Sequence, residues 1–196
     1  MTESPRVAVV GAGNMGANHA RVVAANPRVE LAVVIDVDAE RADAVAGPLG
    51  GAGSSDLAAA ADCDAVVVAA TTEAHLDIAL PLLEGGVSCL VEKPLALTGS
   101  EARQLAKLAL ERNLVLSVGH QERLVFEAMG LFATGERPKR VEAVRMGPAS
   151  PEGRCEDVSV VFDLMIHDLD LAAELFDRGG ELAIVRLLRR ELADAE

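Results

Sequence analysis

A glycine pattern near the start of the chain has the spacing of a phosphate-binding loop. Residues 11–16 read Gly-Ala-Gly-Asn-Met-Gly, between an apolar run at 6–11 and a stretch with helical spacing at 15–26. In a strand–loop–helix of this kind the first glycine permits a tight turn, the second lets the backbone approach a pyrophosphate, and the third allows close helix packing. The helix start offers N–H groups to phosphates. The residues expected at this dinucleotide site are Gly11, Gly13, Asn14, Met15 and Gly16.

An acidic residue stands where a dinucleotide site uses one. Asp36 ends a second apolar run, 29–36, about 20 residues beyond the loop. A carboxylate there accepts hydrogen bonds from the ribose hydroxyls of the adenosine and repels a 2′-phosphate, and Asp38 adds to that repulsion. NAD is therefore the favoured cofactor. Arg41 is close enough in sequence to keep NADP open as a second cofactor.

Two further groups could handle a proton. Lys93 follows the apolar run 88–91 within a Glu-Lys-Pro sequence, and strand ends in such sheets point into the ligand crevice.

The segment 157–177 is predicted to be a helix that is apolar nearly all round, which predicts burial. It nevertheless carries one polar stripe, formed by Asp163, His167, Asp170 and Glu174. A carboxylate one turn before a histidine can orient the ring and raise its basicity, so a lysine, a histidine and an aspartate in one pocket could move the proton that accompanies hydride transfer. Zinc-type histidine spacings are absent from the sequence, and no metal is expected.

The elements that would position these groups alternate along the chain. Apolar runs predict strands at 6–11, 29–36, 65–70, 88–91 and 115–119, and helical spacing predicts helices at 15–26, 39–46, 56–61, 74–84 and 99–113. This order predicts right-handed crossovers and a doubly wound parallel sheet of the Rossmann type. Beyond it we expect a strand at 140–146, a loop at 148–153, the apolar helix, and an exposed helix at 178–196.

Length and composition limit the classes of partner. A chain of 196 residues suits one full domain and part of another. A net charge of -13, with no Trp, no Tyr and four Phe, argues against nucleic acid and anionic membranes as partners. The sequence shows neither an apolar run long enough to span a membrane nor a signal peptide. Its three scattered cysteines, read as small buried hydrophobes, fit a reducing cytoplasm.

Four stretches together resemble the Gfo/Idh/MocA family of glucose-fructose oxidoreductases, inositol 2-dehydrogenases and rhizopine-catabolism proteins. They are VAVVGAGNMGANHARV (7–22), TTEAHLDIALPLLEGGVSCLVEKPLA (71–96), VGHQERL (118–124) and DLMIHDLDLA (163–172). The resemblance implies a Rossmann domain followed by an α/β domain with an open antiparallel sheet. It also implies oxidation or reduction of a secondary alcohol or ketone on a sugar, an inositol or a nucleotide-sugar.

The resemblance also implies roles for single residues. His167 would be the general acid or base, Asp163 would orient it or touch the substrate, and Lys93 would bind the reacting oxygen. The cofactor contacts expected outside the glycine loop and Asp36 are Thr71, Thr72, His75 and Glu92, with His75 near the nicotinamide ribose. The expected substrate-binding residues are Lys93, His120, Arg123, Asp163 and His167.

Family members normally continue beyond the apolar helix, so we expect a C-terminally truncated member. Residues 1–122 would form the NAD(P)-binding Rossmann domain, and 123–196 a partial domain with a truncated antiparallel sheet and a helix. An uncovered apolar helix face would favour a homo-oligomer. The leading hypothesis is an NAD(P)-dependent dehydrogenase acting on CH–OH groups. The alternative is a catalytically impaired dinucleotide-binding protein without turnover. A reductase of the dihydrodipicolinate or homoserine type would share only the domain with the glycine loop, and the Glu-Lys-Pro and DLMIHDLDLA segments argue against it.

Overall fold

The chain forms two compact units, residues 1–120 and 121–196, in a computed structural model that describes residues 4–133, 140–144 and 161–177. The side chains at 162, 163, 176 and 177 lie outside this description. The division into domains 1–122 and 123–196 remains a prediction.

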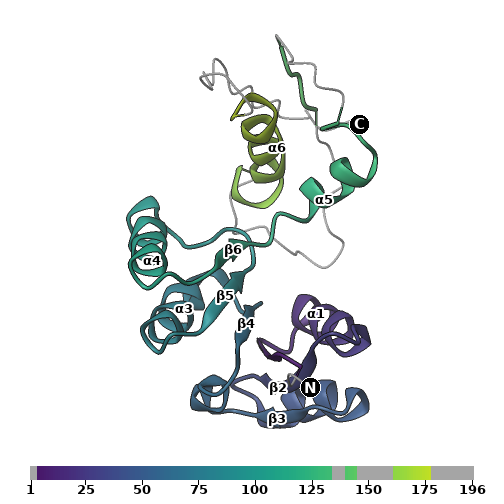
Figure 1. Ribbon diagram of the computed structural model, residues 1–196, viewed down its shortest axis with the longest axis vertical. Coiled ribbons are helices and arrows are strands. Elements are labelled where there is room, and N and C mark those ends of the chain that lie inside the picture. Colours follow the sequence, from purple (N-terminus) through teal and green to yellow (C-terminus); the bar gives the residue numbers. More distant parts are fainter. Residues whose placement is uncertain (1–3, 134–139, 145–160, 178–196) are drawn as a thin grey trace, which may run out of the picture. The chain divides into compact units, whose positions relative to one another are not determined.

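The first unit is built on a six-stranded sheet in the order β3-β2-β1-β4-β5-β6, with every neighbouring pair parallel (Figure 1). The strands are β1 (Arg6–Val10), β2 (Glu30–Ile35), β3 (Ala52–Ser54), β4 (Ala65–Val68), β5 (Ser88–Val91) and β6 (Leu116–Val118). The predicted Rossmann-type sheet is confirmed. The chain runs outward from β1 in one direction and then from β4 in the other, so the strand order reverses between β1 and β4. Open α/β sheets bind ligands at such a point, outside the carboxyl ends of the strands.

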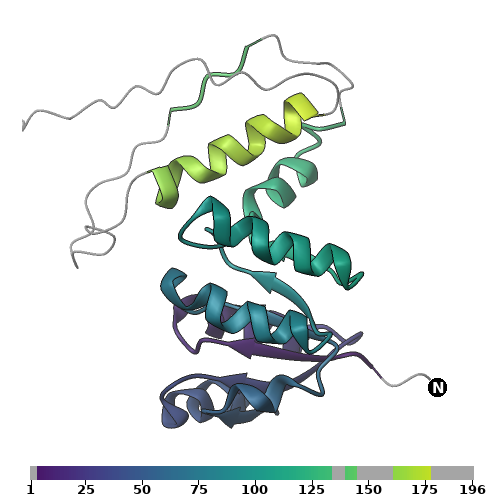
Figure 2. The same cartoon turned by 90° about the vertical axis from the view of Figure 1, so that its left-hand side faces the viewer.

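Helices cover both faces of this sheet. They are α1 (Asn14–Ala25), α2 (Ala39–Ala46), α3 (His75–Glu84) and α4 (Gly99–Glu111), with short 3-10 turns η1 (Gly47–Leu49), η2 (Leu57–Ala60) and η3 (Thr72–Ala74). The helices α1 and α2 contact β1, β2 and β3, whereas α3 and α4 cover the opposite face over β4, β5 and β6 (Figures 1 and 2). A capping box, in which Thr98 and Glu101 bond each other's backbone N–H, starts α4.

The core consists of two apolar layers, one on each face of the sheet. In β1, Val7 and Val9 belong to the layer under α1 and α2, and Ala8 and Val10 belong to the layer under α3. Burial on both faces explains why the strands are apolar without alternation. The cysteines at 63 and 89 are buried as expected, and burial raises the pKa of Cys89 to about 12, which keeps it a thiol. Cys155 lies outside the described residues.

All regular secondary structure in the described part of the second unit is helical. It comprises α5 (Gln121–Ala128), the π-helical turn η4 (Val161–Met165) and α6 (Ile166–Asp177). The expected strand at 140–146 is wrong for residues 140–144, which form no strand, because no described segment pairs with them and Val141 and Val144 are exposed. Among the described side chains of α6, Leu171 is buried and the others are half-buried, as expected for an apolar helix that lacks part of its cover. The expected loop at 148–153 and helix at 178–196 lie outside the described residues.

Helix length and polarity also bear on membrane association. None of the helices within the described ranges is long and apolar enough to cross a membrane.

Candidate functional site

The glycine loop joins β1 to α1 at the carboxyl edge of the sheet. Gly11 has a φ of +99°, and a Cβ there would lie 2.6 Å from the carbonyl oxygen of Ala69. A Cβ on Gly16 would overlap the carbonyl group of Gly11. The turn and packing roles expected of these two glycines are confirmed. Around Gly13, by contrast, a Cβ would meet nothing within 4 Å, so the chain leaves open space at the position where a pyrophosphate is expected.

The start of α1 is suited to an anion. Gly13 is its N-cap residue, and no side chain among the described residues caps the helix. The first turn carries no acidic residue, and Asn14 is exposed while Met15 is half-buried. The positive end of the helix dipole and its first N–H groups can therefore serve phosphate oxygens. The residues present fit the dinucleotide that the sequence implies.

Asp36 follows β2 and is tied to the loop. Its Oδ2 accepts a hydrogen bond from Ala12 N–H at 2.7 Å, and its Oδ1 accepts from Asp38 N–H at 3.0 Å and from Arg41 Nη2 at 2.6 Å. Burial would raise the pKa of Asp36, but these hydrogen bonds and the charge of Arg41 outweigh it and hold the pKa below its ordinary value. The Asp36 side chain is 9% exposed and that of Arg41 is 50% exposed. An ionised carboxylate therefore lies beside the loop, with a cation next to it.

The Glu-Lys-Pro segment follows β5. The Glu92 side chain is 9% exposed, and its Oε1 lies 2.7 Å from Nε2 of His19 on α1. Lys93 is half-buried, and the peptide bond between it and Pro94 is cis. The carbonyl oxygen of Pro94 lies 2.9 Å from Nδ1 of His75, which is buried at the start of α3. Sequence reasoning missed His19, whose signal was its place in the helix that follows the glycine loop.

The remaining expected residues of the first unit follow other strand ends. Thr71 and Thr72 come soon after β4, where Thr71 precedes the turn η3. Because Gly11 packs against Ala69, this segment adjoins the glycine loop. His120 follows β6 and is half-buried. The expected cofactor residues thus come from one edge of one sheet, while their contacts with the cofactor remain predictions.

In the second unit, Arg123 of α5 is bound by two acidic residues of α6. Its Nε and Nη2 donate to the two carboxylate oxygens of Asp170 at 2.7 Å and 2.6 Å, and its Nη1 donates to Glu174 at 2.8 Å. Arg123 therefore pairs with two of the four residues of the polar stripe predicted from the sequence, Asp170 and Glu174. His167 is half-buried on the same helix, and Asp163 lies in η4 with its side chain outside the description. Lys93 belongs to the first unit, so its convergence with His167 remains a prediction.

Comparison with known proteins identifies the family. The model of the Gfo/Idh/MocA family, described as an oxidoreductase family with an NAD-binding Rossmann fold, matches residues 5–120. The chain belongs to this family. Its Gfo/Idh/MocA membership agrees with the resemblance carried by the sequence motifs and with NAD as the expected cofactor.

Individual Gfo/Idh/MocA relatives cover most of the chain. UDP-N-acetylglucosamine 3-dehydrogenase of Acidithiobacillus ferrooxidans is 42% identical to this chain, and the match covers 92% of this chain and 56% of the length of that enzyme. Its solved structure superposes with a TM-score of 0.82 over 89% of this chain and 57% of its own, at 39% identity. An inositol 2-dehydrogenase of Rhizobium meliloti is 30% identical over 85% of this chain and 53% of its own. The structure of GenD2 from gentamicin A biosynthesis, in complex with NAD, has a TM-score of 0.74 and 34% identity over 89% of this chain and 54% of its own. The chain thus spans about half the length of these relatives.

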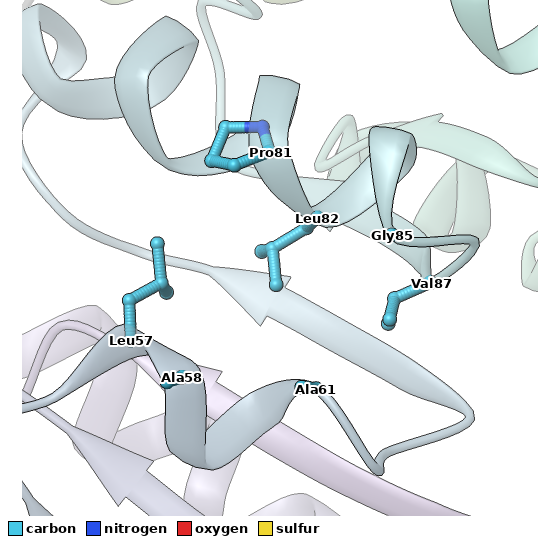
Figure 3. A pocket seen from close by; sticks show the side chains of 7 residues that line it. All are labelled: Leu57, Ala58, Ala61, Pro81, Leu82, Gly85 and Val87. Atoms are coloured by element: carbon cyan, nitrogen blue, oxygen red, sulfur yellow. The ribbon is translucent and has the colours of Figure 1, made fainter.

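A different concavity of this Gfo/Idh/MocA chain does not suit the cofactor. A hollow of about 210 Å³ lies between η2 and α3, lined by aliphatic side chains that include Leu57, Pro81, Leu82 and Val87 (Figure 3). It has no charged lining residue to pair with phosphate. Within the described residues, moreover, no group of three His, Cys, Asp or Glu side chains could hold a metal ion.

Proposed function

We propose that the chain binds NAD at the carboxyl edge of its first unit and transfers hydride between the nicotinamide and a secondary alcohol or ketone carbon of a sugar, an inositol or a nucleotide-sugar. One observation carries the proposal. An uncapped helix start with open space at Gly13 lies next to the ionised Asp36, and these are the groups that recognise the pyrophosphate and the adenosine ribose of a dinucleotide.

The surroundings of Asp36 bear on the choice between cofactors. An ionised carboxylate favours the ribose hydroxyls of NAD and repels the 2′-phosphate of NADP. Arg41 can pair with a 2′-phosphate, because its side chain is half exposed beside that carboxylate. We therefore propose NAD as the main cofactor and NADP as a weaker one.

Both units contribute to the proposed chemistry. When bound, the nicotinamide supplies or accepts the hydride. His167 takes the proton of the substrate hydroxyl in the oxidative direction and returns it in reduction, with Asp163 orienting the ring. Lys93 donates a hydrogen bond to the reacting oxygen, and His120 lines the substrate side. Arg123 was also expected there, and its ion pairs with α6 support a role in holding the helix that carries His167.

Among the substrate classes, a nucleotide-sugar is favoured. The relative named UDP-N-acetylglucosamine 3-dehydrogenase is 42% identical, whereas the inositol 2-dehydrogenase of Rhizobium meliloti is 30% identical. The substrate is therefore proposed to be a UDP-sugar with a free secondary hydroxyl, ahead of a free polyol.

Calorimetric titration with NAD tests the cofactor site. In Gly13→Ala the new methyl group projects into the open space proposed for the pyrophosphate, and we expect NAD affinity to fall at least about tenfold with no loss of thermal stability. Gly47→Ala is the matched control, because its Cβ also meets open space but lies in η1, outside the loop. Equal NAD affinity in the wild type and in Gly13→Ala would contradict the proposed site.

Turnover is measured separately, as NADH formed from NAD with UDP-N-acetylglucosamine or myo-inositol. His167→Ala should abolish turnover and leave NAD affinity unchanged. If the wild type binds NAD but oxidises no member of a polyol and sugar-nucleotide panel, the alternative of a catalytically impaired dinucleotide-binding protein holds.

The proposal also includes a cytoplasmic homo-oligomer that acts on small molecules and not on nucleic acid. The net charge of -13 argues against nucleic acid. On α5, Leu124 and Val125 are 68% and 54% exposed, and exposed apolar groups of this kind are commonly covered by a second copy. Size-exclusion chromatography with light scattering should show a dimer or larger species, and a compact monomer would contradict this part.

A further inference from the structure

We propose that two histidines outside the reacting centre position Lys93, by holding the residues on either side of it. His19 holds Glu92, and His75 holds Pro94. The functional importance of Lys93 rests on the proposed function. We call the His19–Glu92 contact and the His75–Pro94 contact the two braces. Both lie within the first unit, and they make His19 and His75 positioning residues.

The first brace is a buried acid–imidazole pair. Glu92 is 7% exposed, and a carboxylate removed from water is costly unless charge or hydrogen bonds compensate it. His19 supplies that compensation across 2.7 Å, from the helix that begins at the glycine loop. The other carboxylate oxygen of Glu92 accepts a hydrogen bond from Lys93 N–H at 3.3 Å. One side chain thus links α1 to the backbone of Lys93.

A third element confines the same carboxylate. A Cβ on Gly119, which follows β6, would lie 2.9 Å from Oε1 of Glu92 and 3.0 Å from its Oε2. The carboxylate therefore packs directly against the glycine backbone and has no room to swing toward β6. His19 and Gly119 thus confine the Glu92 carboxylate from two different elements.

The second brace joins the segments after β4 and β5. His75 is 1% exposed, with Nδ1 2.9 Å from the Pro94 carbonyl oxygen and Nε2 3.2 Å from the Ala70 carbonyl oxygen. A neutral imidazole has one N–H and can donate to one of these oxygens, whereas an imidazolium can donate to both. In either state the ring lies between the two segments. The family resemblance implies that His75 and Glu92 contact the cofactor, but their burial and their hydrogen-bond partners favour an indirect role.

The arrangement couples two parts of the proposed site. The helix whose start would hold the pyrophosphate also anchors, through His19, the residue before Lys93. A change at His19 should therefore alter the environment of the Lys93 amine although the two side chains belong to different elements. A purely local stabilising role for His19 predicts no such effect.

The chain offers a direct readout, because its three lysines are Lys93, Lys107 and Lys139. Reductive methylation of the full chain with ¹³C-formaldehyde labels each amine, and Lys93→Arg assigns the Lys93 signal in the NMR spectrum. The experiment uses no cofactor. In His19→Leu we expect the Lys93 methyl signal to shift or broaden, with the Lys107 signal unchanged.

Other variants separate positioning from general damage. His19→Gln keeps an N–H donor near the Glu92 carboxylate and should restore the wild-type Lys93 signal, while His75→Leu should perturb it and His75→Asn should restore it. Arg21→Ala, an exposed change on the same helix, should leave the signal unchanged. If His19→Leu does not fold, Gly119→Ala replaces it, because it crowds the Glu92 carboxylate without removing a hydrogen-bonding group.

An unshifted Lys93 signal in folded His19→Leu, or in folded Gly119→Ala, overturns the proposal. Equal perturbation by His19→Gln and His19→Leu also overturns it. Because NAD is absent from these samples, a wild-type chain that fails to bind NAD but shows the coupling would contradict the proposed function and leave the braces standing.

Discussion

The carboxylate of Asp36 accepts a hydrogen bond from the backbone N–H of Ala12, with 2.7 Å between Asp36 Oδ2 and the amide nitrogen. Asp36 directly follows β2, and Ala12 lies inside the glycine loop. The acid expected to bind ribose therefore also fixes the loop expected to bind phosphate. A substitution at Asp36 should therefore affect both the binding of the ribose and the conformation of the glycine loop.

Replacement of the acid tests its ribose role. Asp36→Asn keeps the size of the side chain but loses the charge that accepts hydrogen bonds strongly from ribose hydroxyls. We expect NAD affinity to fall about tenfold, or 1.4 kcal/mol, with a smaller loss for NADP because repulsion of the 2′-phosphate is also removed. Calorimetric titration with both cofactors measures this. A parallel loss of affinity for the two would contradict the assignment.

The same carboxylate predicts a pH-dependent contribution to stability. Hydrogen bonds and Arg41 lower the folded-state pKa of Asp36 below its ordinary value of 3.8. The stabilisation is therefore fully present above that ordinary value and is lost as the pH falls through the lower folded-state pKa. Asp36→Asn should cost about 1–2 kcal/mol of unfolding free energy at neutral pH. Urea denaturation at decreasing pH should show this difference shrinking below pH 3.8, and a constant difference would be inconsistent with the pairing.

Arg41 should determine how strongly the chain binds NADP relative to NAD. Its Nη2 lies 2.6 Å from Asp36 Oδ1, and half of its side chain is exposed and able to meet a 2′-phosphate. Arg41→Ala should lower NADP affinity about tenfold relative to NAD affinity. Competition between the cofactors, followed by NADH fluorescence, gives the ratio. An unchanged ratio would mean that Arg41 serves Asp36 alone.

Most elements of the first unit could be predicted from the sequence, because its strands are buried on both faces and therefore appear as apolar runs. The predicted helix 39–46 and strand 88–91 match α2 and β5 at both ends. The strand β3 was missed, since its three residues, Ala-Gly-Ser, have little strand propensity and owe their conformation to pairing with β2. The helix α5 was missed too, although its sequence is amphipathic; it is only eight residues long, about two turns.

Site residues were predictable where a motif specifies them and not where tertiary contacts do. The glycine loop and Asp36 follow from a spacing with a physical cause. The partners of Glu92 and Asp170, however, are His19 and Arg123, which lie 73 and 47 residues away in the chain. Pairing over such separations depends on the sheet order and on helix packing, which local patterns do not encode.

The turn at Gly11 should be sensitive to a single methyl group. Gly11→Ala puts an L-residue at a φ of +99° and brings its Cβ within 2.6 Å of the Ala69 carbonyl oxygen. Backbone strain of this kind costs about 1–3 kcal/mol, and at roughly 2–4 °C per kcal/mol for a chain of this length the Tm should fall by roughly 2–12 °C. Gly47→Ala, with φ of -56° and open space at Cβ, should leave the Tm unchanged or slightly raised. Calorimetry should rank the variants in this order, and equal Tm values would contradict the turn geometry.

The Arg123 ion pairs should hold α5 and α6 together. The bidentate contact leaves Asp170 only 9% exposed, so Arg123→Ala leaves a nearly buried carboxylate without its main cation and should cost about 1–3 kcal/mol. Hydrogen exchange along α6 should then accelerate, while NAD affinity, a property of the first unit, stays unchanged. Arg123→Lys should recover only part of the protection, because lysine cannot form the two-pronged contact. Arg140→Ala is the matched control, since Arg140 and Glu142 form an exposed pair of little energetic value. If Arg140→Ala and Arg123→Ala accelerate exchange in α6 equally, the ion pairs do not stabilise that helix.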